Sequence, residues 1–274
     1  MRAILIASSV LALLVARQAW PARLALALGV MGFVGPSAGG QEFRINTKLF
    51  EGLGGEPVSE SVTVFTEGRV YDFIHTAPQE IAVFDTATEV FTLLDPQRKT
   101  QTIIRGDDLA RFVARLKARA AEASPLAAFA AAPQFHVAAD GDENWLKLSS
   151  DLMIYECLTI SAPDEDVSRE FRRFCDWTAR LNTTRPGALP PQARLELNSE
   201  LAGRRLLPTQ VKLTLVTRRG DPQRYRSESL FNWALLPADK ENMRKANAMF
   251  ETFQVVTLAE FRGLKQQTNS KPRR

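Results

Sequence analysis

The feature that most constrains the fold is a series of short alternating segments between residues 42 and 104. Apolar side chains recur two residues apart, as in Val62 and Val64, which is the period of a strand with one buried face. Turns containing Gly, Asp or Pro separate the segments at intervals of about ten residues, as in a meander of antiparallel strands. We expect strands at 43–50, 58–66, 69–75, 80–85, 89–94 and 99–104.

The remaining chain mixes helical and strand patterns. An amphipathic helix begins near Asp107 and runs into the Ala-rich stretch 118–132, because apolar residues follow a helical period from Leu109 to Leu116. Segregated runs of strands and helices indicate an α+β fold, with a curved antiparallel sheet on which this amphipathic helix packs. We expect further helices at 165–182, 191–203 and 238–250, and further strands at 134–138, 144–149, 152–158, 207–218, 224–235 and 253–258.

The first forty residues indicate export of the rest of the chain. They hold no Asp or Glu, and two apolar runs, Ala3–Ala16 and Leu24–Gly35, each follow basic residues. The second run ends in Pro-Ser-Ala-Gly-Gly, small residues of the kind that a signal peptidase cleaves. Neither run reaches the roughly 20 residues that span a bilayer. We therefore expect a signal peptide at 1–40 and a periplasmic or cell-envelope location. An uncleaved N-terminal anchor is the alternative and would be the only contact with a membrane.

The charge distribution argues against a nucleic-acid partner. The formal net charge is +4, but three of the positive charges lie in the export segment and three more at the end of the chain. We expect residues 265–274 to form a basic disordered tail. The body at 41–264, which we expect to be a single domain, is then close to neutral and carries no basic footprint for nucleic acid.

The two cysteines both fall in the exported part. An even pair in an oxidising compartment suggests a disulfide between Cys157 and Cys175. Such a bond would close a loop of about 19 residues and stabilise the fold by roughly 3 kcal/mol in the chain-entropy model. Two buried free thiols are the alternative.

No pattern of metal or nucleophile chemistry is present. His75 and His136 are the only histidines and lie far apart, whereas a zinc site needs three or four ligands. The sequence also lacks a Gly-x-Ser-x-Gly elbow, a Walker loop and a dinucleotide fingerprint. We therefore expect no metal, no cofactor and no catalytic residues.

Carboxylates are the only other candidates for chemistry. Asp72, Asp85, Asp95 and Asp140 lie near the ends of expected strands, where Asp usually begins a turn. A hydrolase that uses two of these carboxylates is the enzymatic alternative, because glycoside hydrolysis needs such a pair.

Three strand-and-turn segments carry a resemblance to a known class of proteins. They are Val70-Tyr71-Asp72-Phe73, Ile81-Ala82-Val83-Phe84-Asp85 and Phe91-Thr92-Leu93-Leu94-Asp95-Pro96. In these successive hairpins the chain resembles the exported half-barrel proteins that include the Lol-type lipoprotein carriers. The resemblance implies a half-barrel sheet, a helix on its concave face and a scaffold that binds something apolar. The Pro-rich centre and the helices between 160 and 205 depart from that pattern, so carrier activity is not implied.

Aromatic and aliphatic residues of this region are the candidate ligand-binding residues. We expect an exported non-enzymatic protein that binds an apolar or lipid-like ligand in the envelope. The alternative is a structural or interaction protein of the envelope, with a filled core and an exposed apolar patch that meets another protein. The candidate ligand-binding residues are Tyr71, Phe73, Phe84, Phe91, Phe112 and Leu116.

Overall fold

The computed structural model describes residues 42–52, 54–139, 144–216 and 220–264, so the expected signal peptide or anchor and the expected basic tail lie outside the described residues. In chain order the elements are β1 (Phe43–Glu51), β2 (Ser59–Thr66), β3 (Arg69–Ile74), β4 (Glu80–Asp85), β5 (Val90–Asp95), β6 (Thr100–Arg105), α1 (Gly106–Ala123), α2 (Pro125–Ala131), β7 (His136–Ala139), β8 (Trp145–Ser149), β9 (Met153–Ser161), α3 (Glu165–Asn182), α4 (Gln192–Gly203), β10 (Leu206–Leu215), β11 (Gln223–Asn232), α5 (Pro237–Thr252), β12 (Gln254–Val255) and α6 (Leu258–Phe261). Strands β1 to β6 begin and end within one residue of the positions predicted from the sequence.

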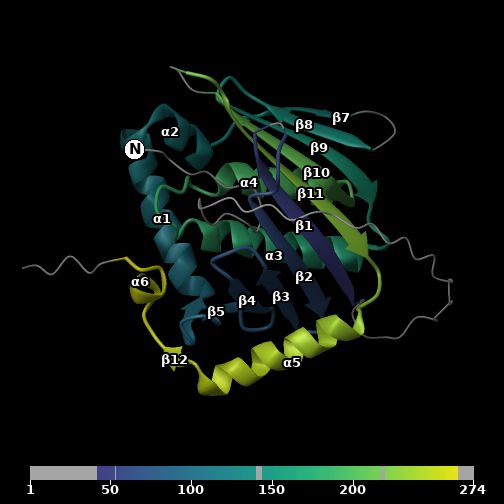
Figure 1. The fold of residues 1–274 in the computed structure, drawn as a ribbon. Helices are drawn as coiled ribbons and strands as arrows, with labels where there is room; N and C mark the ends of the chain where they lie inside the picture. Colours follow the sequence, from purple (N-terminus) through teal and green to yellow (C-terminus); the bar gives the residue numbers. More distant parts are fainter. Residues whose placement is uncertain (1–41, 53, 140–143, 217–219, 265–274) are drawn as a thin grey trace, which may run out of the picture.

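All twelve strands belong to one curved, open sheet (Figure 1). Their order is β12-β6-β5-β4-β3-β2-β1-β11-β10-β9-β8-β7. The α+β class is confirmed, and a half-barrel shape is compatible with this curvature. The prediction of a purely antiparallel sheet is wrong in one place, because β12 runs parallel to β6.

Two equivalent turns shape the meander from β4 to β6. Asp85 Oδ1 accepts a hydrogen bond from the backbone N–H of Thr88 at 2.9 Å, and Asp95 Oδ1 accepts one from the N–H of Arg98 at 2.8 Å. Glu89, which follows the first of these turns, has the positive φ of a left-handed residue. The prediction that these Asp residues begin turns is therefore confirmed, since each carboxylate caps its own loop.

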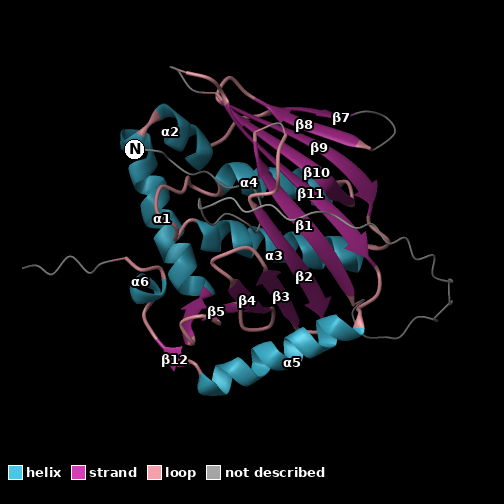
Figure 2. Ribbon diagram, in the orientation of Figure 1, coloured by secondary structure: helices cyan, strands magenta, loops and turns pink. Residues whose placement is uncertain are grey.

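The helices cover the sheet unequally (Figure 2). On the inner face, α3 packs over β1 to β6, and α4 packs over β8 to β11. On the outer face, α5 covers β2 to β5, where Val64 and Val83 pack with Ala246 of the helix. The sheet is thus enclosed on both faces in one half and on the inner face alone in the other half.

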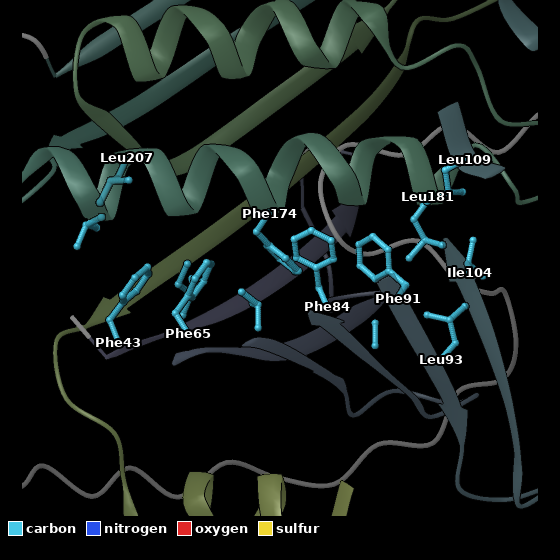
Figure 3. Close-up of a cluster of buried hydrophobic side chains, with 14 of the residues drawn as sticks. Phe43, Phe65, Phe84, Phe91, Leu93, Ile104, Leu109, Phe174, Leu181 and Leu207 are labelled. Carbon is cyan, nitrogen blue, oxygen red and sulfur yellow. The ribbon is translucent and has the colours of Figure 1, made fainter. Parts of the chain in front are cut away.

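The helix on the inner face is not the one that the sequence suggested. Helix α3 holds that position, starting where Asp164 Oδ1 accepts the N–H of Val167 at 2.8 Å, and Phe174 points from it into the strand aromatics (Figure 3). Helix α1 instead packs on α2, on α3 and on the end of β6. Gly106 begins α1 so close to α3 that an added Cβ would lie 2.8 Å from the Trp177 ring.

The C-terminal segment returns to the β6 edge and is fixed there by side chains. The amide nitrogen of Gln101 donates to the carbonyls of Phe250 and Phe253, at 2.9 and 2.8 Å. Arg98 donates to the carbonyl oxygens of Glu260 and Phe261 in α6. The short parallel strand β12 and helix α6 therefore cover this edge of the sheet.

Candidate functional site

The predicted ligand-binding aromatics are divided between the two faces of the sheet. Phe84 and Phe91 point inward, with ring centroids 4.6 Å apart, and are fully buried under α3 (Figure 3). Tyr71 and Phe73 point outward and lie under α5. The division follows from register, because Val70 pairs with Phe84 and the next residue of a strand faces the opposite side.

The two predicted residues of α1 lie apart from these aromatics. Phe112 is 36% exposed, and Leu116 is half-buried. The buried side of α1 is formed by Leu109, Val113 and Ala120. The structure therefore gathers the six predicted residues at three places and not in one pocket.

The space between the inner face and the helices is filled. The cavities lined by residues of α3 or α4 have volumes of about 50, 30 and 10 Å³. Pockets that enclose a small-molecule ligand usually measure about 300–1,000 Å³. The described inner cavities are thus the size of one or a few water molecules.

The disulfide predicted between Cys157 and Cys175 is not formed, and both residues are buried free thiols. Cys157 packs inside the apolar cluster under α4, whereas Cys175 lines a small cavity under α3 with the guanidinium of Arg194 beside it. Burial raises the pKa of each thiol to about 12. Since the thiolate is the reactive form, both side chains are inert at neutral pH.

A buried charge cluster lies at the start of β4. Of its members only Asp72 was named from the sequence, and the prediction that it lies near a strand end is wrong, because Asp72 lies inside β3. Glu80 Oε1 binds Arg185 Nη2 at 3.2 Å, and its other oxygen binds Arg262 Nη1. Asp72, in the middle of β3, lies nearby and accepts a hydrogen bond from the Thr63 hydroxyl at 2.9 Å. The available signal was a lone carboxylate inside the apolar strand Val70–Ile74, since strand interiors disfavour Asp.

Burial dominates the electrostatics of this cluster. It raises the pKa of Asp72 to about 7, against the hydrogen bond from Thr63, and the nearby Glu80 carboxylate raises it further. Burial also lowers the pKa of Arg185. Both Glu80 oxygens are occupied by arginines, so the cluster joins β4 to the loop after α3 and to the segment after α6. Asp140, the last of the carboxylates considered for hydrolysis, lies outside the described residues.

A groove on the outer face has a volume of about 590 Å³. Val83, Thr92 and Ile103 are adjacent across β4, β5 and β6 and form its floor. Phe250, near the end of α5, closes one side. Ile103 is 55% exposed in this floor and pairs with Thr92 of β5 on one side.

Charged residues border this outer groove. Asp85 pairs with Arg69 at 3.6 Å, and Glu89 with Arg173 at 3.1 Å. Hydrogen bonds from Thr88 lower the pKa of Asp85, and Asp107 sits at the positive N-terminal turn of α1. Arg105 and Asp107 make no ion pair or side-chain hydrogen bond with any described residue, so the rim carries one cation and one carboxylate without partners. The other rim residues are Val90 and Gly106.

Metal and membrane signals are not found in the described part of the chain. No group of three or more His, Cys, Asp or Glu side chains there could hold a metal ion. No helix among the described residues is both long and apolar enough to cross a bilayer.

The chain was compared with known protein families and with curated proteins. No family model matches the chain, and a search of curated proteins found no match.

Proposed function

We propose that this protein is an exported, non-enzymatic component of the cell envelope that binds a partner protein in its outer groove. The observation that carries the proposal is the exposed Ile103 at the centre of a groove with a charged rim. An apolar centre with a polar border is the usual anatomy of a protein–protein contact. Export rests on the pattern of residues 1–40.

The groove favours one partner chemistry. Ile103 offers apolar contact area to an aliphatic or aromatic side chain, which would be desolvated at the centre of the contact. Arg105 offers an unpaired guanidinium, whose best complement is a carboxylate bound through two parallel hydrogen bonds. The partner segment should therefore present an apolar side chain next to an Asp or Glu.

Site-specific photo-crosslinking in the native cell tests this proposal. We expect a photoreactive residue in place of Ile103 to give one discrete protein adduct, and Arg105→Glu to abolish it. The matched control places the same residue at Leu230, which is 62% exposed on the outer face of β11. Equal adducts at both positions, or an adduct indifferent to Arg105→Glu, would count against the groove.

The apolar-ligand hypothesis makes a different prediction for the same protein. The inner cavities are too small for a lipid, so a lipid could bind there only if α3 moved away from Phe84 and Phe91. Native mass spectrometry of protein purified from exporting cells, followed by organic extraction, separates the two functions. A bound lipid-sized mass supports a carrier, and a ligand-free mass at several protein concentrations supports a partner-binding protein.

A further inference from the structure

Helix α4 carries a buried arginine that has no counter-charge in contact with it. Arg194 is only 7% exposed, and its Nε donates to the Asn198 side-chain oxygen at 2.9 Å. Asn198 in turn donates to Asp176 Oδ1 at 2.8 Å, so the nearest carboxylate on this side is reached through a neutral amide. The Nη1 atom of Arg194 is buried with no hydrogen-bond partner among the described residues. A buried charge left in this state is unfavourable unless something else pairs with it.

A small cavity lined by both polar and apolar side chains lies beside this guanidinium. Its volume is about 30 Å³, and it lies between α3, α4 and the inner face of β1, β2, β10 and β11. Arg194 lines this cavity together with Cys175, and on its other side it lines a second cavity of about 50 Å³ with Tyr155. The polar lining consists of Arg194, Cys175, Thr47, Thr63, Ser227 and Ser229.

The lining offers donors but no anion. The hydroxyls of Thr47 and Ser229 lie 3.3 Å apart and bond each other, whereas the Thr63 hydroxyl is committed to Asp72. The buried Ser227 hydroxyl bonds no side chain in the described part of the chain. Cys175 stays protonated because burial raises its pKa, so its thiol supplies no negative charge.

We propose that this cavity binds one monatomic anion of the chloride type between Arg194 and Ser227. The free Nη1 and the free hydroxyl supply two hydrogen-bond donors, and the guanidinium supplies the opposite charge. A volume of about 30 Å³ is of the size of a single halide ion. This site lies on the opposite face from the outer groove and does not depend on the function proposed for that groove.

Thermal unfolding of the full exported protein tests the site. The midpoint is compared in sodium chloride and in sodium gluconate at equal ionic strength, because gluconate is too large for the cavity. We expect saturating chloride to raise the midpoint by about 5 °C, as for a ligand that binds only the folded state. Arg194→Met should lose this difference. Arg169→Met is the matched control, because Arg169 is a solvent-accessible arginine on α3 that pairs with the exposed Asp166, and it should keep the difference.

Bromide gives a second measurement that needs no variant. We expect crystals of the wild-type protein grown in bromide to show an anomalous peak within hydrogen-bond distance of Arg194 Nη1 and Ser227 Oγ. Equal midpoints in chloride and gluconate, or a cavity without anomalous signal, would overturn the proposal and leave water as the occupant. The crystal result decides the matter even if Arg194→Met does not fold.

Discussion

The two halves of the sheet are built from the same strand pattern but are enclosed differently. In the half from β2 to β5, α3 covers the inner face and α5 covers the outer face. In the half from β8 to β11, α4 covers the inner face and the outer face meets solvent. That open face carries ion pairs such as Lys147 with Glu156 at 3.5 Å and Arg226 with Glu228 at 3.4 Å.

This difference is visible in the strands themselves. Strand β3 is buried at every position after Arg69, whereas β9 alternates between buried and partly exposed positions from Met153 to Cys157. A strand enclosed on both sides tolerates polar groups only when they are paired, which explains why Asp72 and Glu80 belong to a network. A strand enclosed on one side can place its charges in water, where pairing is weak and optional.

The largest expected difference between the halves comes from substituting one outer-face residue of each half by Asp. Val64→Asp buries a charge under α5, and we expect it to cost more than about 4 kcal/mol in the free energy of unfolding. Thr214→Asp places the same group on the open face of β10, opposite Arg224, and should change stability by less than about 0.5 kcal/mol. Urea unfolding measures both. Similar losses would mean that the outer face of β10 is covered in solution.

Removing an ion-pair partner should also cost more stability in the enclosed half than in the open half. Glu80→Gln removes the buried partner of Arg185 and Arg262, and we expect a loss of about 3 kcal/mol, because two buried cations are left unpaired. Glu156→Gln removes the exposed partner of Lys147 and should cost about 0.5 kcal/mol or less. The comparison fails if the two variants unfold at the same urea concentration.

The enclosed half should also carry an unusual pH dependence. The folded-state pKa of Asp72 is about 7, so between about pH 4 and 7 the folded protein holds a proton that the unfolded chain has lost. Folding then takes up a proton, and the free energy of unfolding falls as pH rises through this window, by at most about 4 kcal/mol. Asp72→Asn should remove this component and gain about 2 kcal/mol over wild type at pH 8. A constant difference between the two proteins from pH 4 to 8 would contradict the raised pKa.

The smallest expected change in stability concerns a hydrogen bond between β3 and α5 in the enclosed half. The Tyr71 hydroxyl donates to the Asn247 side-chain oxygen at 3.0 Å. Tyr71→Phe removes this bond, and we expect a loss of about 1 kcal/mol, the usual net value of one hydrogen bond. In an Asn247→Ala background the same change should cost less, which a double-mutant cycle measures, and any remaining loss reflects the contact of Tyr71 with Arg69. An unchanged loss in that background would show that the hydroxyl acts elsewhere.

Most of the secondary structure could be predicted because its signals are local. Strand period, Asp-containing turns such as the one at Asp85 and the acidic N-terminus of α3 lie within a few residues of what they determine. The face of each aromatic could not be predicted in this way. Tyr71 and Phe84 were assigned to one pocket, and they separate because the register of the β3–β4 hairpin places Val70 opposite Phe84.

The candidate sites were harder to predict from the sequence than the secondary structure, because segments far apart in the chain form them. The outer groove needs Phe250 to return beside Ile103, and the anion cavity needs α4 to lie over β11. Two local signals were nevertheless present in the sequence. Arg194 shares the buried side of α4 with Leu197 and Leu201, and Asp72 interrupts an apolar strand. Polar residues in such positions need partners, which makes them useful markers of buried chemistry.

The two edges of the sheet differ in how much unpaired backbone they present to another strand. At one end β12 and α6 lie against β6, and the side chain of Gln101 fixes the returning chain. At the other end, within the described part of the chain, β7 pairs with β8 alone, so the backbone groups of 136–139 on its other side have no strand partner there. An unpaired edge strand is a template for another strand. Of the two terminal strands in the described part of the sheet, β7 has four residues and β12 has two, so β7 offers the longer template.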